Sequence, residues 1–151
     1  MKDCKETCYK YLSYSRTEYE VREYLKLEGF SFDDIEDAVV DAKALGYIDD
    51  PDYAQSFVND HLLINRWGPI KIKMKLREKG IEESLINFAL EDNELIIRQN
   101  LFRAISKKAP SLDLSEYRDV QKLIRHLSNK GYGFDLIKEE IQNYEEYEND
   151  E

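Results

Sequence analysis

Apolar residues recur along this chain in three copies of one pattern, each 51 residues after the last. Every copy has apolar residues four apart ahead of a glycine, one directly after it, and two more at six and ten residues beyond it. The glycines are Gly29, Gly80 and Gly131, and the apolar positions are Val21, Leu25, Phe30, Ile35 and Val39, then Ile72, Leu76, Ile81, Ile86 and Leu90, then Leu123, Leu127, Tyr132, Ile137 and Ile141. A period of this length indicates stacked supersecondary units.

The spacing predicts that each unit is helical. Apolar positions four apart lie on one face of a helix. A glycine between two such faces is typical of the residue after a helix end, where a positive φ costs glycine little and the next apolar residue packs back on the last turn. We therefore expect a positive φ at all three glycines.

Further apolar periodicity upstream adds a third helix to every unit. The expected helices span 4–14, 16–28 and 32–45, then 51–64, 69–79 and 82–92, then 94–108, 116–130 and 134–144. The predicted fold class is all-α, with three tandem three-helix repeats. Their expected bounds are 1–48, 49–93 and 94–144, followed by an acidic, disordered tail over 145–151.

One segment is ambiguous by pattern alone. Residues 70–76 alternate strictly between apolar and basic side chains, which by itself is typical of a half-buried strand. Their repeat partners, 19–25, have no such alternation, and Pro69 suits the first position of a helix, so we predict a helix. Capping-box spacing predicts two further helix starts, at Ser15 with Glu18 and at Ser31 with Asp34.

Charge distinguishes the middle repeat from the rest of the chain. The net charge of −10 argues against non-specific affinity for nucleic-acid phosphate. Residues 66–79, which we call the basic segment, nevertheless carry six basic residues against Glu78 alone. On a helix, Ile70 and Met74 would point away from the buried face, between basic residues. They either form the apolar centre of a protein-binding surface or pack against a neighbouring repeat.

The predicted partner-binding residues come from this segment. Trp67 lies in a link between helices, where so large a ring either staples the link to the core or contacts a partner. The candidate site consists of Arg66, Trp67, Ile70, Lys71, Lys73, Met74, Lys75 and Arg77.

Other residues with chemical potential have structural interpretations. Cys4 and Cys8 lack the spacing of a redox or zinc site and are expected to be small apolar side chains. His61 fits the apolar register of its helix, and Asp49 with Asp50 suits a helix start with a favourable dipole interaction. We expect no catalytic residue, cofactor or metal.

Residues 46–81 contain a distinctive series of motifs, namely Gly46-Tyr47-Ile48-Asp49-Asp50, Tyr53-Ala54, Phe57-Val58, Arg66-Trp67-Gly68-Pro69, Ile72, Leu76 and Lys79-Gly80-Ile81. This series resembles the signature of the RecX family of recombinase regulators. Tyr11-Leu12-Ser13-Tyr14-Ser15-Arg16-Thr17-Glu18 with Val21-Arg22 is also similar to that family's first repeat. The match covers roughly residues 8–142 and is weaker in the third repeat.

The resemblance implies a cytosolic bacterial protein of three tandem three-helix repeats, curved and elongated. It also implies binding to the RecA–single-stranded DNA filament, usually with inhibition of strand exchange and ATP hydrolysis, and no catalysis by the protein itself. We expect a monomer in the cytoplasm, without a membrane segment and with single-stranded DNA in the filament as a possible further contact. Two alternatives stay open, a helical-repeat protein that binds single-stranded DNA directly and a generic helical scaffold.

Overall fold

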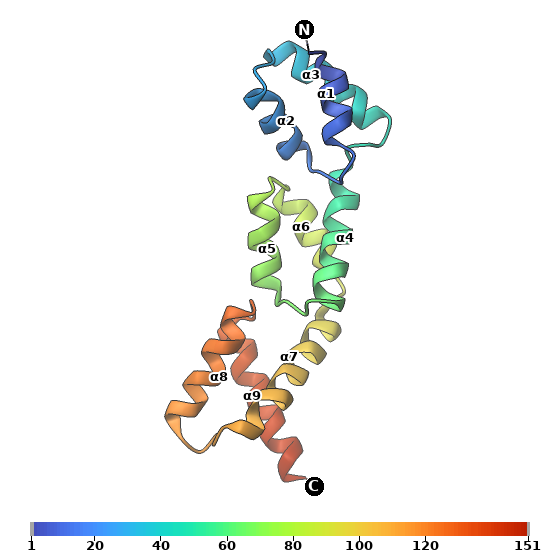
Figure 1. Ribbon diagram of the computed structural model, residues 1–151. Coiled ribbons are helices and arrows are strands. Elements are labelled where there is room, and N and C mark those ends of the chain that lie inside the picture. Colours follow the sequence, from blue (N-terminus) through green and yellow to red (C-terminus); the bar gives the residue numbers. More distant parts are fainter. Residues whose placement is uncertain (1, 151) are drawn as a thin grey trace. The chain divides into compact units, whose positions relative to one another are not determined.

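The computed structural model describes residues 2–150, and all regular structure within them is helical (Figure 1). The helices are α1 (Cys4–Tyr11), α2 (Glu18–Leu27), α3 (Phe32–Ala44), α4 (Asp50–Leu63), α5 (Pro69–Glu78), α6 (Glu83–Leu90), α7 (Glu94–Lys108), α8 (Tyr117–Asn129) and α9 (Phe134–Asn149), with a 3₁₀ turn, η1 (Ala109–Ser111), after α7. The predicted all-α class is confirmed. Residues 70–76 lie inside α5, so the helical interpretation of their alternating pattern is correct.

Two of the predicted helix boundaries are wrong by several residues. Helix α1 ends at Tyr11, ahead of the predicted 14, because Ser13 and Ser15 follow and serine favours turns over helix interiors. Helix α9 continues to Asn149, so 145–149 of the expected disordered tail is helical, while residue 151 lies outside the described residues. Contacts of Phe102 with the rings of Tyr144 and Tyr147 hold this extension.

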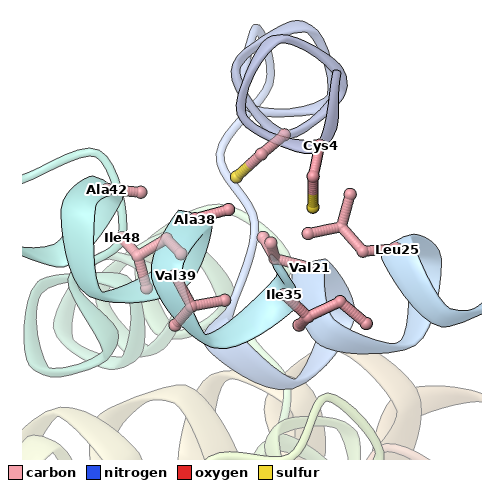
Figure 2. Packing of buried hydrophobic residues seen from close by; sticks show 9 residues of the cluster. Cys4, Val21, Leu25, Ile35, Ala38, Val39, Ala42 and Ile48 are labelled. Atoms are coloured by element: carbon pink, nitrogen blue, oxygen red, sulfur yellow. The ribbon is translucent and has the colours of Figure 1, made fainter. Parts of the chain in front are cut away.

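The first repeat has a core of apolar side chains from all three of its helices. Helices α1, α2 and α3 pack pairwise, and the side chains of Cys4, Leu25 and Ile35 point toward one another between them (Figure 2). The buried cluster consists of Cys4, Cys8, Val21, Leu25, Ile35, Ala38, Val39, Ala42 and Ile48. In the third repeat α7, α8 and α9 also pack pairwise. The repeated helix positions predicted to be apolar are buried in every copy, except that Leu90 is only half-buried.

The turn glycines have the predicted conformation. Their φ angles are 90° at Gly29, 77° at Gly80 and 101° at Gly131. In each turn the residue after the glycine donates its N–H to the carbonyl five residues back, as in the bond from Phe30 to Leu25 at 3.2 Å. This bonding pattern is the Schellman motif, which satisfies carbonyls at the helix end.

The described chain divides into two compact units, and the boundary between them passes through the middle repeat. The first unit contains the residues up to Phe57 together with Lys75–Ala89. The second unit contains Val58–Met74 together with the residues from Leu90 onward. The C-terminal part of α4 and the N-terminal part of α5, which residues 64–68 connect, therefore belong to the same unit as the third repeat. The N-terminal part of α4 and the C-terminal part of α5 belong to the same unit as the first repeat. Among residues 2–150, no helix is long and apolar enough to cross a membrane.

Candidate functional site

The link between α4 and α5 is held in place by backbone contacts with the third repeat. Gly68 donates its N–H to the Lys130 carbonyl at 2.7 Å, and Ile70 donates to the Gly131 carbonyl at 3.0 Å. The Tyr132 hydroxyl donates to the Arg66 carbonyl at 2.9 Å. Arg66 itself has a φ of 56°, a conformation that non-glycine residues adopt only when their surroundings enforce it. These contacts fix the direction in which α5 begins.

The first unit has an equivalent junction at the start of α2. There the Thr17 hydroxyl donates to the Lys79 carbonyl at 2.6 Å. Thr17 corresponds to Gly68, and Lys79 to Lys130, one 51-residue period later. The turn after the second helix of one repeat thus docks on the start of the second helix of the preceding repeat, and it does so twice in the chain.

These junctions give Gly80 and Gly131 a second constraint beyond their φ angles. A Cβ on Gly80 would lie 2.2 Å from the Tyr19 Cβ, and a Cβ on Gly131 would lie 2.4 Å from the Lys71 Cβ. Gly29, in the first of the three repeats, has nothing within 4 Å of its own Cβ position. The close approach explains why a residue without a side chain is needed at both docked turns.

The outward direction predicted for two apolar residues of α5 is observed. Ile72 and Leu76 are fully buried, whereas Ile70 is 56% exposed and Met74 is 47% exposed. The Ile70 side chain also lies beside Gly133, so it is partly covered by the turn that begins α9. Helix α5 therefore presents two apolar side chains on its open face.

The cations of the basic segment fall into two groups. In the first unit, Lys75 pairs with Glu78 at 3.6 Å, Arg77 pairs with Glu83, and Lys79 pairs with Glu20 at 3.6 Å. In the second unit, Arg66, Lys71 and Lys73 form no ion pair with any residue that the structure describes. The unneutralised charge beside Ile70 and Met74 thus comes from Lys71 and Lys73.

Trp67 makes contacts of its own within the second unit. Its ring stacks on the His61 ring, with centroids 4.0 Å apart and an interplanar angle of 8°, and the Lys71 Nζ lies 4.3 Å above it. The ring is half-buried, and this packing favours the interpretation of Trp67 as a staple for the link. A cation over the ring face adds roughly 0.5–1 kcal/mol at an exposed site, which positions Lys71 as well.

The remaining candidate residues have structural roles. Asp49 precedes α4 and accepts the Asp52 N–H at 3.1 Å, as expected of a helix N-cap. Asp50 accepts the Glu18 N–H at 3.0 Å, and burial raises the pKa of its carboxyl. Burial also raises the pKa of the Cys8 thiol to about 11, which keeps it protonated and unreactive at neutral pH. Within residues 2–150, no three His, Cys, Asp or Glu side chains come together as a possible metal site.

A second group of cations, which the repeat pattern did not indicate, lies in the third repeat. A cleft of about 350 Å³ lies against the end of α7 and one face of α8, and we call it the α8 cleft. It is lined by Lys108, Leu112, Lys122, Arg125, His126 and Asn129. A count of charges could have indicated it, because residues 103–130 contain seven basic and three acidic residues in an otherwise acidic chain.

Fold and surface together define a class, a protein of tandem three-helix repeats with an exposed apolar and cationic helix in its middle repeat. Residues 4–40, 49–90 and 97–141 match the first, second and third three-helix domains of RecX, in that order. This chain therefore belongs to the RecX family.

Individual relatives agree with that membership. A regulatory protein RecX from Clostridium botulinum (strain Eklund 17B / Type B) is 34% identical over 96% of this chain and 71% of its own length. A regulatory protein RecX from Streptococcus agalactiae serotype V is 32% identical over 89% of this chain and 53% of its own length. The crystal structure of RecX from Lactobacillus salivarius superposes with a TM-score of 0.85 at 28% identity, over 94% of each chain.

Proposed function

We propose that this protein binds the RecA–single-stranded DNA filament in the cytoplasm and inhibits strand exchange and the accompanying ATP hydrolysis. The observation that carries the proposal is the match of this chain to all three RecX domains. The similar proteins reported above are named regulatory proteins. Regulation by binding needs no catalytic group of its own, and a surface of apolar and cationic side chains suits that role.

The proposed contact surface lies in the second unit, on the link before α5 and on the helix itself. It consists of Arg66, Trp67, Ile70, Lys71, Lys73 and Met74. Protein interfaces commonly place apolar anchors at the centre and charged groups at the rim. Ile70 and Met74 supply the anchors here, and the unpaired Lys71 and Lys73 supply charge that would attract an acidic partner surface.

A filament pulldown with and without single-stranded DNA tests the function. We expect retention by RecA filaments, little retention by bare DNA under the same salt conditions, and slower ATP hydrolysis by RecA. Retention by bare DNA alone would instead support the direct DNA-binding alternative. Retention by neither the filament nor bare DNA would contradict both binding hypotheses. The remaining alternative would be a generic helical scaffold.

Truncating Ile70 and Met74 to alanine tests the surface. If they are central anchors, the double variant should lose about 1–3 kcal/mol of filament affinity. Its melting temperature should stay close to that of the parent, because both side chains are about half exposed. A decrease of roughly 2–5 kcal/mol in unfolding free energy would instead mean that they pack between repeats, and would refute the binding role.

Charge reversal separates the two groups of cations. The K71E/K73E variant should slow association with the filament, and the effect should shrink in salt. The comparison variant is K75E/R77E, which changes the net charge by the same amount. It alters the other two predicted site residues, Lys75 and Arg77, which are both paired with glutamates. Equal effects would mean that general charge, and not the surface in the second unit, attracts the partner.

A further inference from the structure

The α8 cleft is built from one face of a helix and the end of another. Lys122, Arg125, His126 and Asn129 follow the i, i+3, i+4, i+7 spacing, which brings them to the same side of α8. Lys108 is the last residue of α7, and Leu112 provides an apolar contact at the edge. All these residues belong to the second unit, so the second unit alone supplies the cleft.

The charges in the cleft are all of one sign. No carboxylate lines it, and Lys108, Lys122 and Arg125 form no ion pair within the described part of the chain. By contrast, Arg98 in the same unit contacts Glu94, Glu139 and Glu140 together. Like charges held together without a counter-charge repel one another, so an anionic ligand would relieve the repulsion.

The pKa of the histidine in the cleft is affected by the same positive charges. Burial, with the nearby Lys130 and Lys108, lowers the pKa of His126 below its ordinary value of 6.5. The groups that face it are Lys108 at the end of α7 and Lys122, Arg125 and Lys130 on and just after α8. A bound anion would oppose this field and raise the pKa of the imidazole.

We propose that the α8 cleft binds successive phosphate groups of single-stranded DNA. The cations form a row, because Arg118, exposed and without an ion pair among the described residues, precedes Arg125 by seven residues on the same face of α8. Seven residues of helix span about 10 Å, which exceeds the size of a single carboxylate and suits a polyanion. The choice of single-stranded DNA as the ligand rests on the proposed function. The observation that the cations of the cleft have no counter-charge is independent of that function.

The acidity of the rest of the chain would help such a ligand to bind in one place. With a net charge of −10, most of the surface repels a phosphate backbone, and a local cationic cleft then selects where the strand can lie. Binding of this kind is sensitive to salt, because each neutralised phosphate releases counterions.

Fluorescence anisotropy of a labelled oligothymidylate, without any recombinase, tests the proposal on the full chain. K122E/R125E should bind about tenfold more weakly than the parent at low salt. Its salt dependence should be shallower by about 0.7 in log–log slope for each phosphate that the protein no longer neutralises. The control K5E/K138E changes the net charge by the same amount at exposed residues outside the cleft and should bind like the parent. Thermal unfolding of both variants checks that the fold is retained.

A second readout uses the fact that the chain has only two histidines. In NMR titrations the His126 imidazole should shift on addition of oligothymidylate and its pKa should rise, so that affinity increases as the pH falls and this imidazole takes up a proton. A stationary His126 signal, together with equal binding by K122E/R125E and K5E/K138E, would overturn the proposal.

Filament assays on the same variants separate this inference from the proposed function. K122E/R125E could fail to bind the filament and yet bind the oligonucleotide as well as K5E/K138E does. The cleft would then bind acidic side chains of a protein, and the proposal would be wrong. If oligonucleotide binding depends on the cleft while the parent ignores RecA filaments, the phosphate site stands and the proposed function fails.

Discussion

At the scale of single residues, identical amino acids carry different constraints in different repeats. Gly29, Gly80 and Gly131 all have a positive φ, but only Gly80 and Gly131 also lie against a neighbouring repeat. The neighbouring atoms are the Cβ atoms of Tyr19 and Lys71, whose positions follow the backbone of their helices. A clash with them cannot be relieved by turning a flexible side chain.

Alanine substitutions should reveal this difference. Gly29→Ala should lower the free energy of unfolding by about 1 kcal/mol, the usual cost of a positive φ for a residue with a Cβ. Gly80→Ala should cost about 2–4 kcal/mol, because overpacking of the junction adds to the strain. Urea unfolding of the two variants measures the difference, and equal decreases would contradict the close packing of this junction.

A pH-dependent contribution is expected from His126. The fold lowers the pKa of its imidazole, mainly through burial, so the folded protein binds this proton less readily than the unfolded chain. Stability should therefore fall as the pH drops through the unfolded value near 6.5. His126→Gln should reduce that decrease between pH 7 and pH 5. The comparison at pH 8, where both side chains are neutral, isolates any change in packing.

At the scale of elements, a helix start can be decided by a contact far away in the sequence. The predicted capping box at Ser15 and Glu18 is wrong, and the box forms with Thr17 and Glu20, so that α2 begins at Glu18. The Thr17 oxygen accepts the Glu20 N–H at 3.2 Å while its hydroxyl hydrogen goes to the Lys79 carbonyl. The docked turn thus favours the later of the two starts, because only there does the capping hydroxyl gain a second partner.

Removing this hydroxyl should cost more than removing an ordinary cap. Thr17→Val preserves the side-chain shape but removes the cap and leaves the Lys79 carbonyl without its partner, for about 1–3 kcal/mol of stability. The matched control is Ser31→Ala, since Ser31 caps α3 through the Asp34 N–H and should cost about 1 kcal/mol. Thermal or urea unfolding compares them. If Ser31→Ala proved the more damaging, the junction bond would have little energetic weight.

At the scale of the whole molecule, the repeats seen in the sequence are not the compact units of the structure. The middle repeat gives its residues up to Phe57 and from Lys75 to Ala89 to one unit and Val58–Met74 to the other. The hydrogen bond from Asn100 to the Leu62 carbonyl, at 2.8 Å, is one of the contacts that tie the end of α4 to α7 in the second unit. The middle repeat therefore contributes residues to both compact units.

The isolated middle repeat, residues 49–93, should consequently fail to fold. A segment of this length buries little surface, and here its apolar residues would be separated from their partners in both units. Far-ultraviolet circular dichroism should show low helicity and no cooperative melting, whereas the full chain should melt cooperatively. A cooperative transition in the fragment would mean that α4, α5 and α6 form a self-sufficient core.

Much of the fold could be read from the sequence because it depends on local periodicity. Helical apolar spacing predicted the all-α class and the buried positions such as Leu25, Leu76 and Leu127. The turn glycines followed from the same register, since a positive φ after a helix is a local property. Repetition also resolved α5, whose alternating residues alone would have indicated a strand.

The candidate site could be predicted only in part. Exposure of Ile70 and Met74 follows from helical geometry, and the structure bears it out. Pairing of Lys75 and Arg77 with glutamates, and the stacking of Trp67 on His61, depend on how loops and helices meet. Binding by the six residues of the proposed surface stays a proposal, and binding by Lys75 and Arg77 stays a prediction, which the two charge-reversal variants test.

The sequence by itself thus determined the helical class, the repeat and the family resemblance, all of which are encoded within about 50 residues at a time. Only the tertiary structure decided how the middle repeat is divided, which glycines are packed closely and which cations are left without a counter-charge. The physical reason is that these properties arise between residues far apart in the chain. The α8 cleft illustrates it, since Lys108 and Arg125 meet only when α7 and α8 pack together.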